Sequence, residues 1–213
     1  MTEDGRSSGA HLFAHSFGWP PAIPNPAEKA PMSDTSNPPV NPPPPGLIYR
    51  PCVGLMVINH KGQVWIGRRP NASDSPEGAG SWWQMPQGGI DPGETPELAA
   101  KRELWEETGI TSAAIIAESP DWYTYDLPSY LHGRVWGGRY RGQRQKWFLM
   151  RFEGTDGQVN ITPSDAEKIE FDMWRWADLN EVVDLIVPFK REVYAKVVDA
   201  FAPLVAKHTA GSR

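Results

Sequence analysis

A stretch near the middle of the chain, residues 88–110, constrains the fold more than any other part of the sequence. It opens with a glycine-rich loop and continues into a segment with clear helix boundaries. Thr95 and Pro96 mark a helix start, because threonine caps helices and proline favours their first turn. Gly109 suits the left-handed position just past a helix end. These signals predict a helix over Pro96–Thr108.

The predicted helix has an acidic face and an apolar face. At about 100° per residue, Glu103, Glu106 and Glu107 fall within an arc of about 100°. Charges this close repel one another, and no lysine follows four residues along to offset them. Either the face is simply hydrated, or it holds a hard cation such as Mg²⁺ or Mn²⁺, which carboxylate oxygens favour. The residues predicted to face a core on the opposite side are Leu98, Ala100, Leu104 and Trp105.

The loop before the helix favours the cation-binding alternative. Gly88, Gly89 and Gly93 permit backbone conformations that other residues avoid, and they let phosphate oxygens approach closely. Together with Glu94 and the run Arg102–Ile110, they fit every fixed position of the 23-residue Nudix box. The chain therefore resembles the Nudix hydrolases, which use water and magnesium to cut pyrophosphate linkages. This resemblance implies an α/β fold, a Nudix α/β/α sandwich with a mixed β-sheet.

The resemblance also implies roles for the acidic helix. Glu103, Glu106 and Glu107 would be the principal ligands of Mg²⁺, or of Mn²⁺ or another divalent cation in its place. Such an ion shields phosphate oxygens and activates the attacking water. One glutamate of the site would accept the proton from that water, and which one it is differs between Nudix subfamilies. Arg102 would orient a box glutamate by ion pairing, and Glu94 would act at the junction of loop and helix.

Motifs outside the box narrow the resemblance to bacterial RNA pyrophosphohydrolases and dinucleoside polyphosphate hydrolases. They extend over about Tyr49–Phe201, the whole predicted domain. Glu170 resembles a metal-binding glutamate supplied from outside the box. For Tyr125 and Phe189, core packing is the alternative to a role in substrate binding. The residues at positions that resemble phosphate or nucleotide contacts are Arg50, Arg69, Gly88, Gly89, Tyr125, Gln145, Lys146, Val187, Phe189 and Lys190.

Two substrates of this subfamily remain open. The first is RNA with a 5′-triphosphate or 5′-diphosphate, trimmed to a monophosphate end that permits mRNA decay, and it is the predicted substrate. The second is diadenosine tetraphosphate, cleaved to ATP and AMP, since Trp136–Gly142 resembles the enzymes for this compound equally well. A noncatalytic RNA-binding module is an alternative of another class, but such a module has no need of repelling glutamates. Nucleotide-sugar hydrolysis is a weaker alternative, because the accessory motifs for it are not evident.

The segment Arg134–Arg151 is the most basic part of the chain. It carries six arginine or lysine residues and no acid, with Trp136, Tyr140 and Trp147 among them. In a chain of formal net charge -5, this composition favours a local contact surface for polyphosphate or RNA. A hydrated basic loop is the structural alternative.

The 213 residues allow one domain and additional segments. Residues 1–46 hold eleven of the 22 prolines and are predicted to be disordered, either as a tail that docks a proline-binding partner or as a plain tether. Met32 is an alternative start. The hydrolase domain is predicted over residues 47–207, with a flexible tail at 208–213, and no protein partner is indicated.

A single cysteine, Cys52, excludes an internal disulfide and is predicted to be a small buried residue in a reducing cytoplasm. No apolar run reaches the length of a membrane span, and no secretory signal is evident. Hydrophobic periodicity predicts a β-hairpin, several further strands and two helices after the acidic one. Their ranges are Val53–Asn59, Gln63–Arg69, Trp82–Pro86, Ile115–Ala117, Trp122–Leu127, Lys146–Phe152 and Met173–Ala177 for the extended segments, and Asp178–Ile186 and Phe189–Ala206 for the helices.

Overall fold

The computed structural model describes residues 46–70, 82–162 and 169–210. Residues 1–45 of the segment predicted to be disordered lie outside the described residues, as do the last three residues of the predicted tail. Within the described residues, no helix is both long and apolar enough to cross a membrane.

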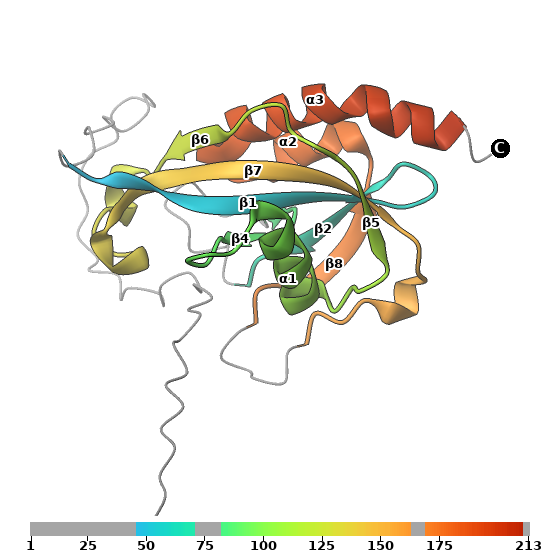
Figure 1. The fold of residues 1–213 in the computed structure, drawn as a ribbon, viewed down its shortest axis with the longest axis horizontal. Helices are drawn as coiled ribbons and strands as arrows, with labels where there is room; N and C mark the ends of the chain where they lie inside the picture. The colour runs from blue at the N-terminus through green and yellow to red at the C-terminus, as the bar shows by residue number, and fades with distance from the viewer. Residues whose placement is uncertain (1–45, 71–81, 163–168, 211–213) are drawn as a thin grey trace, which may run out of the picture.

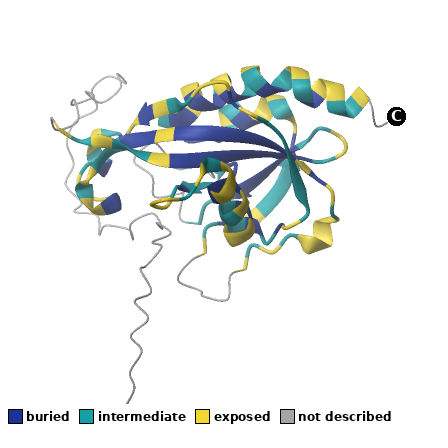
Figure 2. Ribbon diagram, viewed as in Figure 1, coloured by how far each residue is buried: buried dark blue, intermediate teal, exposed yellow. Residues whose placement is uncertain are grey.

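Two long parallel strands form the centre of the sheet, β1 (Ile48–Ile58) and β7 (Tyr140–Phe152). Figure 2 shows that both are buried along most of their length. On its other side, β7 pairs antiparallel with β5 (Ala113–Glu118) and β6 (Tyr123–Asp126). Both central strands begin earlier than predicted, because their N-terminal halves pair with each other and extend the ladder. The sheet is therefore mixed, as expected.

The far side of β1 is built from a hairpin and three short strands. The predicted hairpin is confirmed, since β1 turns into β2 (Val64–Arg68) and Ile58 pairs with Val64. β2 then pairs antiparallel with β3 (Trp83–Gln84) and β8 (Met173–Ala177). The remaining strand, β4 (Gln87–Gly89), pairs antiparallel with β1 and carries the first glycines of the box. β4 was not predicted, because glycine disfavours strands.

Helix α1 (Pro96–Thr108) has the predicted bounds and caps. The side of the helix that packs against the sheet differs from the predicted one. Leu98 and Trp105, which were expected in the core, are 57% and 58% exposed. The buried residues are Ala99, Ala100, Leu104 and Thr108. Along the helix, Glu103 and Glu107 fall on this same inward side, so the surface opposite the glutamates faces solvent. The assignment of Leu98 and Trp105 to the core was therefore wrong, whereas that of Ala100 and Leu104 is confirmed.

The opposite face of the sheet is covered by the C-terminal helices (Figure 1). The predicted short helix is a 3-10 turn, η6 (Leu179–Glu181), followed by α2 (Val182–Leu185). A second turn, η7 (Pro188–Lys190), leads into α3 (Arg191–Ala210). α3 extends beyond the predicted helix end at 206 and into the predicted tail, and the Thr209 hydroxyl donates to Ala206 O at 2.9 Å within its last turn.

Two apolar clusters hold the three layers together. One lies between the sheet and α3, and its largest fully buried members are Trp147, Tyr194 and Phe201. The other lies between the sheet and α1 and includes Trp65, Phe148 and Phe171. Burial of such side chains contributes about 1.5–3 kcal/mol each. This arrangement confirms the expected α/β/α sandwich, and it presses α1 against β1 and β4.

Candidate active site

The glycine loop and the acidic helix meet where β4 lies beside α1. The backbone N–H of Gln87 donates to Glu107 Oε2 at 3.1 Å, which ties the strand to the helix. At the next residue, Gly88, an added Cβ would collide with the Glu103 carboxylate. Only glycine allows this approach, because any side chain at Gly88 would push Glu103 away from the strand. The two predicted parts of the box therefore form one site.

Arg102 is the centre of a network of charged hydrogen bonds beside this contact. Its guanidinium donates two bonds to Glu94, at 2.9 and 2.8 Å, and a further bond to the Gly89 carbonyl oxygen at 2.8 Å. It also donates to Glu103 at 2.8 Å and to Glu106 at 3.2 Å. The Glu94 carboxylate in turn accepts from the backbone N–H of Asp91 at 3.1 Å. Arg102 thus fixes the loop, the start of the helix and Glu103 in one arrangement.

Glu103 and Glu107 are two like charges held close together and partly out of water. Desolvation raises the pKa of the Glu103 carboxyl, and the charge of Glu106 adds to this effect, whereas Arg102 and Arg50 oppose it. Desolvation raises the pKa of Glu107 well above its usual value, and the charge of Glu103 raises it further. Glu107 is therefore short of positive charge in the protein alone, whereas Glu103 is partly neutralised by Arg102.

These two carboxylates fit a divalent cation, because their hard oxygens repel each other and an ion would relieve that repulsion. Three of the four predicted ligands are also paired with an arginine in the protein alone: Glu103 and Glu106 with Arg102, and Glu170 with Arg69. Among residues 46–70, 82–162 and 169–210, no three acidic, histidine or cysteine side chains are already gathered for an ion. Completing the predicted set therefore requires Glu106 and Glu170 to leave their arginines, while Glu103 would keep one oxygen on Arg102 and offer the other to the ion.

A cluster of polar side chains lies beyond β4, and we call it the amide cluster: Gln87, Gln143, Gln145 and Tyr125. Gln145 Nε2 donates to the side-chain oxygens of Gln87 and Gln143, at 3.0 and 2.9 Å. The Tyr125 hydroxyl donates to Gln143 at 2.8 Å. The sequence indicated Tyr125 and Gln145 but missed the other two. The alternation of glutamine at 143 and 145 was the available signal, since it places both on one face of β7.

The predicted nucleotide-binding residues of the C-terminal half gather against Tyr125. The Phe189 ring lies 5.5 Å from the Tyr125 ring between centroids, and Lys190 Nζ lies 5.5 Å from the same Tyr125 centroid. Val187 is buried beside them and accepts from Lys190 N at 3.0 Å. The positive charge of Lys190 acts to lower the pKa of Glu107. Tyr125, with 7% exposure, belongs to the core as well as to this cluster.

Two of the predicted contacts are placed differently. Lys146 follows Gln145 in β7, and successive strand residues point to opposite faces. Its Nζ donates to Ser119 O at 2.5 Å and lies 3.6 Å from Glu118, so the Lys146 ammonium is held near the edge strand β5, and its substrate contact stays a prediction. Arg69, at the end of β2, is ion-paired with Glu170 rather than placed in an open pocket.

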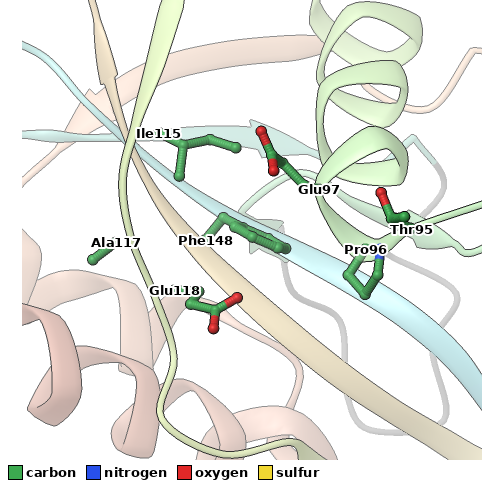
Figure 3. A pocket seen from close by; sticks show the side chains of 7 residues that line it. All are labelled: Thr95, Pro96, Glu97, Ile115, Ala117, Glu118 and Phe148. Carbon is green, nitrogen blue, oxygen red and sulfur yellow. The ribbon is translucent and has the colours of Figure 1, made fainter.

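A separate cavity of about 460 Å³ lies at the start of α1, against the edge strand β5. Figure 3 shows the Phe148 ring between the carboxylates of Glu97 and Glu118. None of the predicted site residues lines this cavity, so it is distinct from the site. The full lining is Thr95, Pro96, Glu97, Ile115, Ala117, Glu118 and Phe148.

Comparison with known proteins gives a family match over most of the described chain. Residues 48–197 match the NUDIX domain family. The RNA pyrophosphohydrolase of Nitrobacter winogradskyi is 54% identical over 159 residues, which are 74% of this chain and 92% of that protein. The RNA pyrophosphohydrolase of Cereibacter sphaeroides strain KD131 is 57% identical over 162 residues, or 75% of this chain and 94% of that protein.

Solved structures support the fold. The E. coli dihydroneopterin triphosphate pyrophosphohydrolase has a TM-score of 0.52 at 20% identity, over 71% of this chain and 98% of its own. A C. elegans Ap4A hydrolase binary complex has a TM-score of 0.51 at 19% identity, over 73% of this chain and 98% of its own. At these identities the likeness concerns the architecture alone.

Proposed function

The chain belongs to the NUDIX domain family, and from this premise we propose that it is an RNA pyrophosphohydrolase that converts 5′-triphosphate RNA ends to monophosphates. One observation carries the proposal. The partly buried and mutually repelling pair Glu103 and Glu107 faces β4, the strand that contains Gly88 and Gly89. The curated relatives support RNA as the substrate. An mRNA-processing enzyme of this kind would act in the cytoplasm, and we propose that location.

We propose Mg²⁺ as the cation, held by Glu103 and Glu107 and completed by Glu106 and Glu170 once these leave their arginines. When bound, the ion neutralises phosphate charge and activates water. The chain itself supplies the positioning: Arg102 holds Glu103 and the Gly89 carbonyl, and β4 keeps Glu107 in place. A carboxylate of the box then accepts the proton while water attacks phosphorus and the phosphoanhydride bond breaks.

Base binding would follow from the aromatic and cationic groups near the amide cluster. Phe189 and Lys190 flank Tyr125, and together they present a ring face and a positive charge to a nucleotide. Aromatic stacking on bases tolerates different bases, which suits an enzyme that must accept many RNA 5′ ends. The same groups also fit an adenosine of diadenosine tetraphosphate, so the choice between these two substrates requires measurement.

A comparison of substrates tests the proposed function. With Mg²⁺ and the full chain, kcat/KM for a 5′-triphosphate RNA should exceed that for diadenosine tetraphosphate by about tenfold or more, because RNA offers additional phosphates and bases to bind. The products should be monophosphorylated RNA ends, which a nuclease specific for 5′-monophosphates reports. A large excess for the dinucleotide would overturn RNA as the substrate, and binding of RNA with no hydrolysis would identify a noncatalytic module.

A further inference from the structure

We propose that a ladder of guanidinium and aromatic groups, Arg50, Trp136, Tyr140 and Arg139, binds the RNA chain beyond its 5′-phosphates. We call these four residues the Arg50–Arg139 ladder. This inference rests on the proposed function, because it assigns a second part of the same substrate to a second surface. It concerns the nucleotides that follow the reacting end, and it leaves the hydrolytic residues as described above.

The ladder begins at the glycine loop and leads outward. An added Cβ on Gly89 would collide with the Arg50 guanidinium, so Arg50 lies directly against the loop. Arg50 Cζ lies 5.7 Å from the centre of the Trp136 ring, and Trp136 meets Tyr140 edge-to-face with 6.4 Å between centroids. Arg139 Cζ lies 5.7 Å from the centre of the Tyr140 ring. Exposure increases along this path, from the buried Trp136 to the half-buried Tyr140 and the exposed Arg139.

The loop that carries the ladder is held in an unusual backbone conformation. Trp136 has a φ of 50°, and the following glycines, Gly137 and Gly138, have φ values of 62° and 70°. For a residue with a side chain, a left-handed backbone costs about 1–2 kcal/mol. Packing of the Trp136 ring in the apolar cluster between the sheet and α3 offsets this cost. The rings are therefore in place before a ligand arrives, which reduces the ordering cost of binding.

The ladder is distinct from the other cations of the basic segment. Arg141 is neutralised by Asp126, to which its guanidinium donates two bonds at 2.8 and 2.9 Å. Arg144 lies on the face of β7 opposite the amide cluster, with its Cζ 4.9 Å from the Trp122 ring. We therefore confine the contact surface predicted for the whole of Arg134–Arg151 to its part in the ladder, which begins where Arg50 lies against Gly89.

The chemistry of the ladder fits a single RNA strand. The half-buried Tyr140 ring offers a face on which an unpaired base can stack, and the guanidinium groups in the ladder can neutralise backbone phosphates. Diadenosine tetraphosphate has no continuing strand, so the outer end of the ladder, Tyr140 and Arg139, would contribute little to its hydrolysis. The ladder therefore predicts an effect that separates the two substrates of the subfamily.

The test uses full-length Tyr140→Ala and Arg139→Ala variants. Binding of an RNA of about eight nucleotides with a 5′-triphosphate is followed by fluorescence anisotropy in a Glu107→Gln background, and turnover is measured with Glu107 intact. We expect Tyr140→Ala to weaken RNA binding and lower kcat/KM on RNA by about tenfold, with turnover of diadenosine tetraphosphate unchanged. Arg139→Ala should also lower the dependence of log Kd on log salt by about 0.7.

Two matched variants complete the design. Tyr140→Phe retains the ring and should restore RNA binding, which a loss of fold would not allow. Arg144→Ala removes a guanidinium from an equivalent ring contact on the other face and should leave RNA binding unchanged.

The outcomes separate the ladder from the proposed function. RNA hydrolysis that is insensitive to Tyr140→Ala and Arg139→Ala would overturn the ladder and leave the function intact. RNA binding that depends on the ladder in an enzyme that does not cut RNA would support the ladder and overturn the function. Absence of both binding and hydrolysis would overturn both.

Discussion

Replacing Glu107 with glutamine should lower hydrolysis of 5′-triphosphate RNA by at least about a hundredfold, the range expected when a ligand or proton acceptor is lost from an active site. The same change should stabilise the metal-free protein. Desolvation and the charge of Glu103 raise the pKa of Glu107, so its ionised form weakens the fold. Glutamine removes that charge and still accepts the Gln87 N–H bond.

The gain in stability should depend on pH in a defined direction. Because the pKa of Glu107 is higher in the folded protein than in the unfolded chain, its ionisation costs stability as pH rises through that interval. The free energy of unfolding of Glu107→Gln should exceed that of the parent at neutral pH and match it in acid, where both side chains are uncharged. Urea denaturation measures both values. A variant that is less stable than the parent at neutral pH would contradict the assigned repulsion.

Substitution of Arg102 by alanine should damage both the fold and the chemistry. It removes the guanidinium that pairs with Glu94 and Glu103, whose side chains are only 16% and 12% exposed. Breaking a fully buried pair costs about 3–5 kcal/mol, and we expect about 2–3 kcal/mol here because Arg102 is 23% exposed. Displacement of Glu103 should lower kcat by about a hundredfold.

Two variants separate the positioning role of Arg102 from charge alone. Arg102→Lys keeps the charge but cannot donate two parallel bonds to Glu94, so its turnover should lie between those of the parent and the alanine variant. Lys101→Ala removes the neighbouring cation, whose ion pair with Glu97 is exposed, and should change stability by less than about 1 kcal/mol. If Arg102→Ala behaved like Lys101→Ala, Arg102 would have no role in the site.

Local signals in the sequence were sufficient for the acidic helix. Thr95 caps α1 through its side chain, and Gly109 ends it with a φ of 68°, so both ends were predictable from two residues. The hairpin and β8 were predictable for the same reason, since their apolar alternation is local. The crowding of three glutamates was also visible, and it identified the face of the helix that we propose holds the cation.

Features that depend on tertiary packing were not predictable from the sequence. The polar half of β7 forms a strand because Gln143 and Gln145 bond within the amide cluster, which becomes visible only when distant segments meet. Leu98 and Trp105 are exposed because Glu103 and Glu107 themselves point inward. The Lys146 ammonium is held by the Ser119 carbonyl and by Glu118, contacts that form only when β5 and β7 meet.

The central claim is that the pair Glu103 and Glu107 holds the divalent cation, and a Mn²⁺ titration followed by electron paramagnetic resonance tests it most directly. The parent protein should deplete the signal of free Mn²⁺, and Glu107→Gln should bind the ion at least about tenfold more weakly. Glu118→Gln, which alters an exposed glutamate beside Lys146, should bind as the parent does. Equal Mn²⁺ affinity in Glu107→Gln and the parent would contradict the claim.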